Sequence, residues 1–290
     1  MVALLEGGGT RPAPTPNHYL EVYSVVTTFC LRLDTMHPIL ARIGPFFLYS
    51  YTVVIGLGIA AALLPPLSRL SAHPTRRLAW LDGFLIGLMA GILLGRVVFV
   101  AANWPYYQEN PDEMIALGQG GLSYHGALLA GLGGFMVWQW WRGWAIAPQL
   151  DLLAPSLVLL SGFGWWACYL EGCAFGQMTV LGWLAADLPD SYGVEAVRYQ
   201  TQLLGLAWSG LTWVVWWWCR GRKLSPGLLF WLTLGLLSCG RVLVNTLRDD
   251  AMPLWHTVRL DTLADGLLVL LALLAGVASL KSASPRFPGN

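Results

Sequence analysis

The residues best placed to do chemistry are polar side chains inside long apolar stretches of the sequence. Arg96 occurs in GRVVFVAAN, His125 occurs in GQGGLSYHGALLAGLGG, and Arg241 occurs with Asn245 in CGRVLVNTLRDD. A charged side chain at the centre of a bilayer costs about 2.5–3.5 kcal/mol on insertion scales, so such residues are functional candidates by default. The pattern therefore indicates chemistry on a molecule that lies inside a membrane.

The two arginines inside apolar runs favour an anionic lipid as that molecule. A guanidinium presents paired, planar donors to phosphate oxygens, and two of them facing one cavity would bind a lipid phosphate. Arg241 and Asn245 are four residues apart, so they share one helical face, and Arg248 follows a turn later. A structural alternative stays open, in which each arginine pairs with helix-end carbonyls or with a carboxylate, the candidates being Asp82, Asp261 and Asp265.

The setting of His125 suits proton transfer. An imidazole titrates near neutral pH and therefore serves as a general acid or base. Ser123 and Tyr124 precede it, and the surrounding glycines let backbone or ligand approach closely. The alternative is a core histidine whose hydrogen bonds are satisfied by its neighbours.

We expect no metal and no cofactor. The histidines are scattered along the chain, and a transition-metal site would need clustered ligands. The cysteines show neither a CxxC pair nor metal-ligand spacing, and we interpret them as small core residues; they are Cys30, Cys168, Cys173, Cys219 and Cys239. A disulfide between Cys168 and Cys173 is conceivable, but two residues five apart on one helix would point in different directions.

The elements that position these residues are predicted to be membrane-spanning helices. Hydrophobic residues make up 56% of the chain and charged residues 11%, and the apolar residues fall in runs near the length that spans about 30 Å of hydrocarbon. The composition predicts an all-α integral membrane protein. The predicted spans are residues 46–64, 81–103, 121–141, 150–170, 200–219, 224–244 and 261–280.

Charges between these spans predict the orientation. Arg69, Arg76 and Arg77 separate the first two spans, whereas NWPYYQENPDEM, between the second and third, has acids and no Lys or Arg. The positive-inside rule then puts the N-terminus outside, the C-terminus in the cytoplasm and residues 171–199 outside. Tryptophans cluster beside Arg142 and Arg220, which is typical of interfacial belts at cytoplasmic helix ends.

The chain is expected to have two parts. Residues 1–35 contain GGGTRPAPTPN and read as a disordered or misannotated N-terminal extension, and residues 36–290 form the seven-helix membrane domain. The net charge of +1, without any block of like charges, gives no reason to expect a nucleic-acid partner.

Six segments resemble, in the same order, segments of prolipoprotein diacylglyceryl transferases. They are HPILARIGPFFLYSY, GRVVFVAAN, GGLSYHGALLAG, DLLAPSLVLLSGFG, EGCAFG and GRVLVNTLRDD. The most specific piece is the pattern G-G-[LM]-S-[FY]-H-G, which Gly120 to Gly126 match. The resemblance covers residues 36–280 and implies seven spans with the N-terminus outside.

The resemblance also implies an activity and a site. Such enzymes reside in the bacterial plasma membrane and move the diacylglyceryl group of phosphatidylglycerol onto the lipobox cysteine thiol of a prolipoprotein, releasing glycerol phosphate. The implied partners are phosphatidylglycerol, signal peptides with a lipobox cysteine, and membrane lipids. His125 and Arg241 would be catalytic. The residues expected to bind lipid phosphate or headgroup are Arg96, Arg241, Tyr51, Ser123, Gly121 and Gln202.

The chain departs from the family pattern at several positions. The chain reads Gly164-Trp165 where the family usually has Gly-Arg, Cys168 replaces an asparagine, and Asn245 stands where glutamate is common. The motif His-Pro-[ST]-Gln-Leu-Tyr-Glu is reduced to YQTQLLG, which keeps Gln202 and ends on Gly205. Two alternatives thus stay open, a member that transfers a different lipid group and a non-catalytic member that binds anionic phospholipid. A transporter is disfavoured because no related halves are visible.

Overall fold

The computed structural model of the chain describes residues 38–43, 46–116, 120–180, 182–190 and 193–283. Its contacts divide the chain between Met36 and His37 into two units. The prediction made for residues 1–35 concerns residues outside the described part. All that follows concerns the second unit, His37–Asn290.

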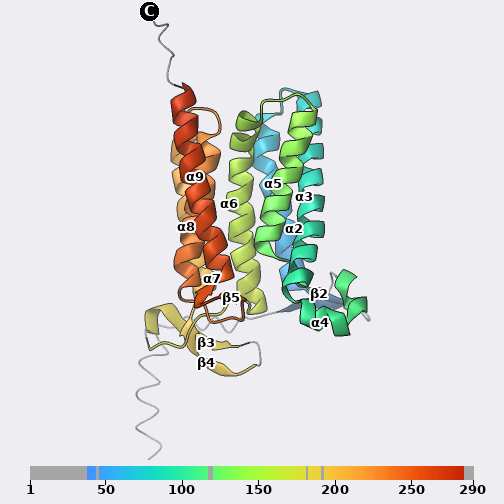
Figure 1. Cartoon of the computed structure of the whole chain (residues 1–290), viewed down its shortest axis with the longest axis vertical. Coiled ribbons are helices and arrows are strands. Elements are labelled where there is room, and N and C mark those ends of the chain that lie inside the picture. The colour runs from blue at the N-terminus through green and yellow to red at the C-terminus, as the bar shows by residue number, and fades with distance from the viewer. Residues whose placement is uncertain (1–37, 44–45, 117–119, 181, 191–192, 284–290) are drawn as a thin grey trace, which may run out of the picture. The chain divides into compact units, whose positions relative to one another are not determined.

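Seven long helices account for most of the described residues, as an all-α membrane protein requires (Figure 1). They are α2 (Ser50–Arg69), α3 (Pro74–Ala102), α5 (Tyr124–Trp141), α6 (Ile146–Glu171), α7 (Thr201–Cys219), α8 (Leu228–Asn245) and α9 (Leu260–Ala283). Five of them, α2, α3, α6, α8 and α9, are long and apolar enough to cross a membrane by length and composition. The helices α5 and α7 contain many tryptophans and polar residues, and a total of seven spans stays a prediction.

The predicted boundary of the first span was wrong. Residues 46–49 belong to strand β2 (Phe46–Tyr49), which pairs antiparallel with β1 (Ile39–Ile43), and α2 begins only at Ser50. Its last turns continue through Pro65 and Pro66 to Arg69. Pro74 starts α3 several residues before the predicted position, since proline fits the first turn of a helix, where no donor is needed.

Close packing of α3 against α5 explains the glycine content of both helices. A methyl group added at Gly87 would lie 2.7 Å from the carbonyl oxygen of Gly131, and one at Gly91 would lie 2.9 Å from that of Ala127. Small residues let helix backbones approach closely in membranes, where association depends on packing rather than on expulsion of water. The two helices thus form one tightly packed pair.

The short elements gather at one end of the helices (Figure 1). They are α4 (Trp104–Glu109), the 3-10 helices η1 (Pro111–Ile115) and η3 (Gly182–Leu184), the hairpin of β3 (Ala185–Pro189) and β4 (Glu195–Tyr199), and the hairpin of β5 (Leu254–Trp255) and β6 (Val258–Arg259). Arg198 fixes the hairpin of β3 and β4 by bonding Asp190 at 3.2 Å and Asp249 at 3.1 Å. We call this end the hairpin end.

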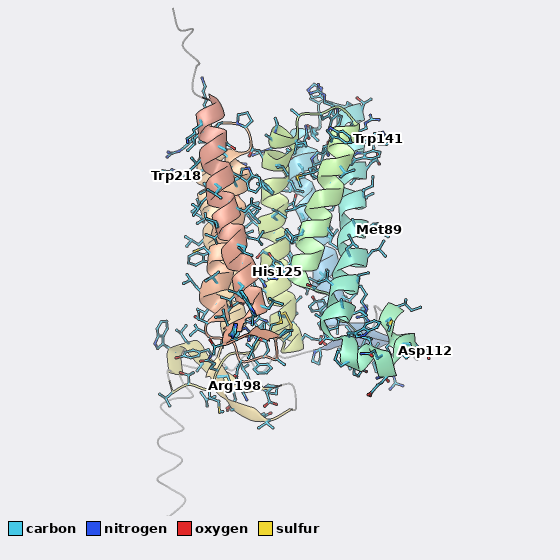
Figure 2. The ribbon with its side chains drawn as sticks, viewed as in Figure 1. Met89, Asp112, His125, Trp141, Arg198 and Trp218 are labelled. Carbon is cyan, nitrogen blue, oxygen red and sulfur yellow. A yellow bond between two sulfur atoms is a disulfide. The ribbon has the colours of Figure 1, made fainter. Side chains whose placement is uncertain are left out.

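The opposite end carries the tryptophan clusters that were predicted to form belts. Trp141 and Trp218 lie there, away from Arg198 (Figure 2). Arg220 lies 3.3 Å from the ring centroid of Trp217, and Arg222 lies 3.7 Å from that of Trp218. These contacts join cations to exposed aromatic faces, as expected at a lipid headgroup boundary.

A carboxylate from α6 caps α8 near that same end. Asp151 accepts hydrogen bonds from the backbone nitrogens of Gly227, at 2.6 Å, and Phe230, at 2.9 Å. The first backbone donors of a helix lack partners within the helix, and an acidic group there also complements the helix dipole. This contact fixes the start of α8 against α6.

Candidate functional site

Two of the predicted site residues meet at one buried carboxylate. His125 Nε2 lies 3.0 Å from Asp265 Oδ1, and Arg241 Nε lies 3.2 Å from both oxygens of Asp265. Asn245 Nδ2 donates to Asp265 Oδ2 at 3.1 Å. Asp265 has no exposed surface. The residues come from α5, α8 and α9, and Figure 2 shows His125 between the middle of the helices and the hairpin end.

Local structure puts these side chains at similar depths. Ser123 caps α5 by accepting a hydrogen bond from the nitrogen of Gly126 at 3.2 Å, so His125 falls in the first turn. Asp265 lies in the second turn of α9. Arg241 and Asn245 are one turn apart near the end of α8. All three helices therefore offer polar groups close to their ends at the hairpin end.

Arg241 is anchored through one nitrogen only. Its Nε bonds Asp265, and within the described part of the chain no hydrogen-bond acceptor contacts its two terminal amino groups. The guanidinium carbon lies 3.7 Å from the ring centroid of Tyr124 and 5.7 Å from that of Trp165. Aromatic faces attract the cation without using its hydrogen-bond donors. Arg241 thus keeps a pair of donors for an anionic ligand.

Arg96 contacts carbonyls instead of a ligand cavity. Its guanidinium donates to the carbonyl oxygens of Glu113, Met114, Ala116, Gly120 and Gly121, at distances of 2.5–3.4 Å. These bonds engage Nε and both terminal nitrogens. The structure does not bring Arg96 to the carboxylate that Arg241 bonds, and these carbonyls engage its donors. The contacts favour the structural alternative for Arg96, in which it pairs with helix-end carbonyls, and a role at the phosphate stays a prediction.

The glycine motif before His125 shapes the same loop. Gly120 and Gly121 have φ of +80° and +82°, a region that favours glycine. A methyl group at Gly121 would lie 2.5 Å from the ring of Phe99 and 2.6 Å from Arg96. Gly121 and Ser123, which were expected to bind lipid, therefore have structural contacts that place His125.

The other two expected lipid-binding residues make no described hydrogen bond to the cluster. Tyr51 is in the first turn of α2, is 40% exposed, and makes no hydrogen bond to the groups around Asp265. Gln202 is fully buried and donates through Nε2 to the carbonyl of Cys173 at 2.7 Å. Gln202 Oε1 has no hydrogen-bond partner among the described residues.

Cys168 and Cys173 form a disulfide, which corrects the expectation that they are unpaired core residues. Helix α6 ends at Glu171, and Gly172 takes a φ of +81°, so the chain reverses instead of continuing the helix. The two Cα atoms are thereby only 4.8 Å apart, within the range for a disulfide. The two cysteines therefore do not lie on one continuous helix, as we had assumed.

Trp165 packs against Gly205, and both residues belong to the departures from the resembled pattern that the sequence shows. A methyl group at Gly205 would lie 2.2 Å from two ring carbons of Trp165. The indole is 6% exposed and packs in a small cluster with Ala174 and Val244. The two departures thus belong to one contact, in which an indole fills the space above a glycine.

An ion-pair network covers the cluster on the hairpin side. Arg248 donates to Asn245 Oδ1 at 2.9 Å and bonds Asp250, and Arg259 bonds both Asp250 and Asp261. Burial lowers the pKa of Arg259, but the hydrogen bond and charge of Asp261 and the charge of Asp250 outweigh this effect and raise it above its ordinary value. Asn245 joins this network to Asp265.

Sequence reasoning treated Asp265 only as a possible partner of an arginine. The available signal was a carboxylate within the apolar run of residues 261–280. Within the described ranges no group of His, Cys, Asp and Glu side chains has the arrangement of a metal site. The cluster combines an imidazole, a guanidinium with available donors and a fixed carboxylate, which suits proton transfer next to a phosphate.

The chain is similar to known proteins over most of its length. A family described as prolipoprotein diacylglyceryl transferase matches residues 38–280. A relative from Bacillus licheniformis, named phosphatidylglycerol–prolipoprotein diacylglyceryl transferase, is 27% identical over 246 residues, which cover 83% of this chain and 91% of the relative. A relative of the same name from Symbiobacterium thermophilum is 29% identical over 251 residues, covering 83% and 92%.

Proposed function

Because the chain belongs to the prolipoprotein diacylglyceryl transferase family, we propose that it transfers the diacylglyceryl group of phosphatidylglycerol to the lipobox cysteine thiol of a prolipoprotein. It is a multi-pass membrane protein, and we place it in the bacterial plasma membrane with the hairpin end outside. The observation that carries the proposal is the meeting of His125 and Arg241 at one buried carboxylate.

The reaction assigns a task to each of these groups. The thiol loses its proton to a base, the sulfur forms a bond to the glyceryl carbon, and the bond from that carbon to the phosphate oxygen breaks. The phosphodiester leaves as glycerol phosphate. The nucleophile belongs to the substrate, so the protein has to supply placement, a proton acceptor and charge stabilisation.

Arg241 is assigned to the phosphate. Its terminal amino groups match two phosphate oxygens and would stabilise the charge that grows on the leaving group. A site closed to water strengthens this interaction, since the local dielectric constant is low. The contacts of Tyr124 and Trp165 with the guanidinium support this role by holding its plane without occupying its donors.

His125 is assigned to the thiol proton. General-base catalysis contributes about 10²–10⁴-fold in rate when the base is within hydrogen-bond reach. Its bond to the same carboxylate oxygen as Arg241 supports the assignment, because the base and the phosphate donor are then adjacent. Tyr51 and Gln202 stay proposed contacts of the lipid headgroup or acceptor.

Replacement of Arg241 tests the proposal. We expect Arg241→Gln to abolish labelling of a lipobox peptide from phosphatidylglycerol at near-normal protein level, and Arg241→Lys to restore only a small part of the turnover. Lysine keeps the charge but lacks the paired planar donors. The exposed Arg142, at the opposite end of α5, provides the matched control Arg142→Gln, which should leave labelling unchanged.

Two results would contradict the assignment. If Arg241→Gln lowers folded yield and labelling in parallel, Arg241 is structural, because an unpaired Asp265 would then destabilise the fold. If the unmodified protein transfers nothing to any lipobox peptide and does not complement a strain depleted of its own transferase, while phosphatidylglycerol binding is still lost in Arg241→Gln, the protein is a lipid-binding member of the family.

A further inference from the structure

Asp265 accepts hydrogen bonds from more side chains than a structural ion pair requires. It accepts hydrogen bonds from Arg241, from Asn245 and from the imidazole of His125, and it is completely buried. An isolated carboxylate is costly to bury, and it is tolerated only with a counter-ion and enough donors. Arg241 alone would supply the counter-ion. The contact with His125 therefore calls for a separate explanation.

The contact with His125 joins helices that do not otherwise pack along each other. Helix α5 packs against α3, and α9 packs against α8. Helix packing alone therefore does not bring the imidazole to α9. The bond between His125 Nε2 and Asp265 Oδ1 is the described polar contact that fixes the ring relative to Arg241.

The bond also decides which nitrogen of His125 carries the proton. Both oxygens of Asp265 accept hydrogen bonds from the guanidinium of Arg241, which has donors only, so the carboxylate acts as an acceptor toward its partners. His125 Nε2 must then be the donor, and in the neutral imidazole Nδ1 is left without a proton. Proton acceptance is thereby assigned to a single atom.

We propose that Asp265 is the positioning residue of the site: it holds His125 with Nδ1 as the proton acceptor and holds Arg241 with both terminal amino groups directed to the lipid phosphate. The roles of proton acceptor and phosphate donor rest on the proposed function. The thiol proton moves to Nδ1, and the imidazolium keeps its Nε2 bond to Asp265. The electron pair of the breaking carbon–oxygen bond goes to the phosphate oxygen at Arg241.

Asp261 offers a matched control. It lies one turn earlier on α9, is also buried, and bonds Arg248 and Arg259 instead of site residues. Asp261→Asn therefore removes a buried, paired carboxylate from the same helix without removing a direct hydrogen bond of His125 or Arg241. Any effect found in Asp265→Asn but not in Asp261→Asn belongs to the cluster.

The first experiment is nitrogen-15 NMR of histidine-labelled protein in micelles, with the His125 signal identified by its loss in His125→Ala. We expect wild type and Asp261→Asn to show protonated Nε2 and bare Nδ1. In Asp265→Asn the carboxamide turns its oxygen to Arg241 and its amino group to His125, so the tautomer should change to protonated Nδ1. A wild-type protein with bare Nε2 overturns the proposal, whether or not any variant folds.

The second experiment measures phosphatidylglycerol binding and transfer separately. Asp265→Asn should lower kcat by at least about 100-fold, the low end for loss of a general base, and should also weaken phosphatidylglycerol binding. Its effect should be much less than additive with those of His125→Ala and Arg241→Gln, since residues that act through one another do not add. Additive effects, or an unchanged tautomer in Asp265→Asn, would refute the positioning role.

These outcomes separate the two proposals. A wild-type protein that transfers nothing but shows the expected tautomer, and loses that tautomer in Asp265→Asn, contradicts the transferase function and keeps the positioning role. A protein that transfers the diacylglyceryl group while Asp265→Asn keeps the wild-type kcat contradicts the positioning role alone.

Discussion

At the scale of single residues, the departures from the family pattern change size and charge together. Trp165 brings a large ring to a position where arginine is usual, and Gly205 provides the space for it. The carboxylate that is common at position 245 is absent, but Asp265 on the next helix bonds Asn245 at 3.1 Å. The cluster thus keeps a carboxylate beside Arg241 although the chain supplies it from another helix.

The fit between Trp165 and Gly205 predicts a strong effect of one methyl group. We expect Gly205→Ala to lower the free energy of unfolding by about 1–3 kcal/mol, the usual range for overpacking, since the added carbon would lie 2.2 Å from the indole. Gly164→Ala is the control, because nothing lies within 4 Å there. Unfolding in micelles measures both variants. Trp165→Ala should relieve the effect of Gly205→Ala, and a failure to do so would contradict this account.

Residue types in the sequence identified His125 and Arg241 but not their common partner. An imidazole among glycines and an arginine in an apolar run are visible in one sequence. The meeting of α5, α8 and α9 at Asp265 is not, because sequence spacing fixes neighbours only along one helix. The contacts of Arg96 could not be predicted for the same reason, since its acceptors are backbone carbonyls of a loop about twenty residues away along the chain.

At the scale of elements, Arg96 works as the anchor of the loop between α4 and α5. We expect Arg96→Gln and Arg96→Lys to lower folded yield and transfer in parallel, because neither side chain can replace five carbonyl contacts and each carbonyl left buried costs about 1–3 kcal/mol. Unfolding midpoints and proteolysis of residues 110–122 measure the effect. Arg77 is exposed and lies on α3, the helix that also contains Arg96, so Arg77→Gln should change neither the unfolding midpoint nor the proteolysis. Normal folding with selective loss of phosphatidylglycerol binding would restore the phosphate role of Arg96.

The helices themselves were largely predictable, whereas the short elements were not. Apolar runs near twenty residues long predict helices because the bilayer leaves backbone groups no other partners. Strand β2 was assigned to the first helix because FFLY is apolar and could belong to a helix or to a strand. The reversal at Gly172 was not predicted either, because the sequence does not show which glycine of an apolar segment takes a positive φ. The disulfide between Cys168 and Cys173 depends on this reversal and was missed with it.

At the scale of the whole membrane domain, the two ends of the helices differ in composition. The hairpin end carries Asp190, Arg198 and the other charged loops, and the opposite end carries Trp141, Trp218 and the arginines that stack on tryptophan (Figure 2). The orientation of these two ends across the membrane stays a prediction from the positive-inside rule.

The orientation predicts the location of two reporters. A reporter fused after Lys223, a few residues beyond Trp218, should be cytoplasmic, and one inserted near Asp190 should be external. Enzymatic reporters that work on only one side of the membrane measure this directly. The reverse pattern would contradict the orientation, and two reporters on one side would contradict the number of spans between them.

Helix α8 is tied near both ends to different neighbours: Asp151 of α6 binds its first turn, and Asp265 of α9 binds Arg241 and Asn245 in its last turns. A slide of α8 by one residue along its axis would be about 1.5 Å and would break both sets of bonds. The position of Arg241 relative to the neighbouring helices is therefore fixed by these bonds. A thinner or thicker membrane has to be met by tilting of the helices together, and the reacting groups keep their mutual positions while their distance from the lipid headgroups changes.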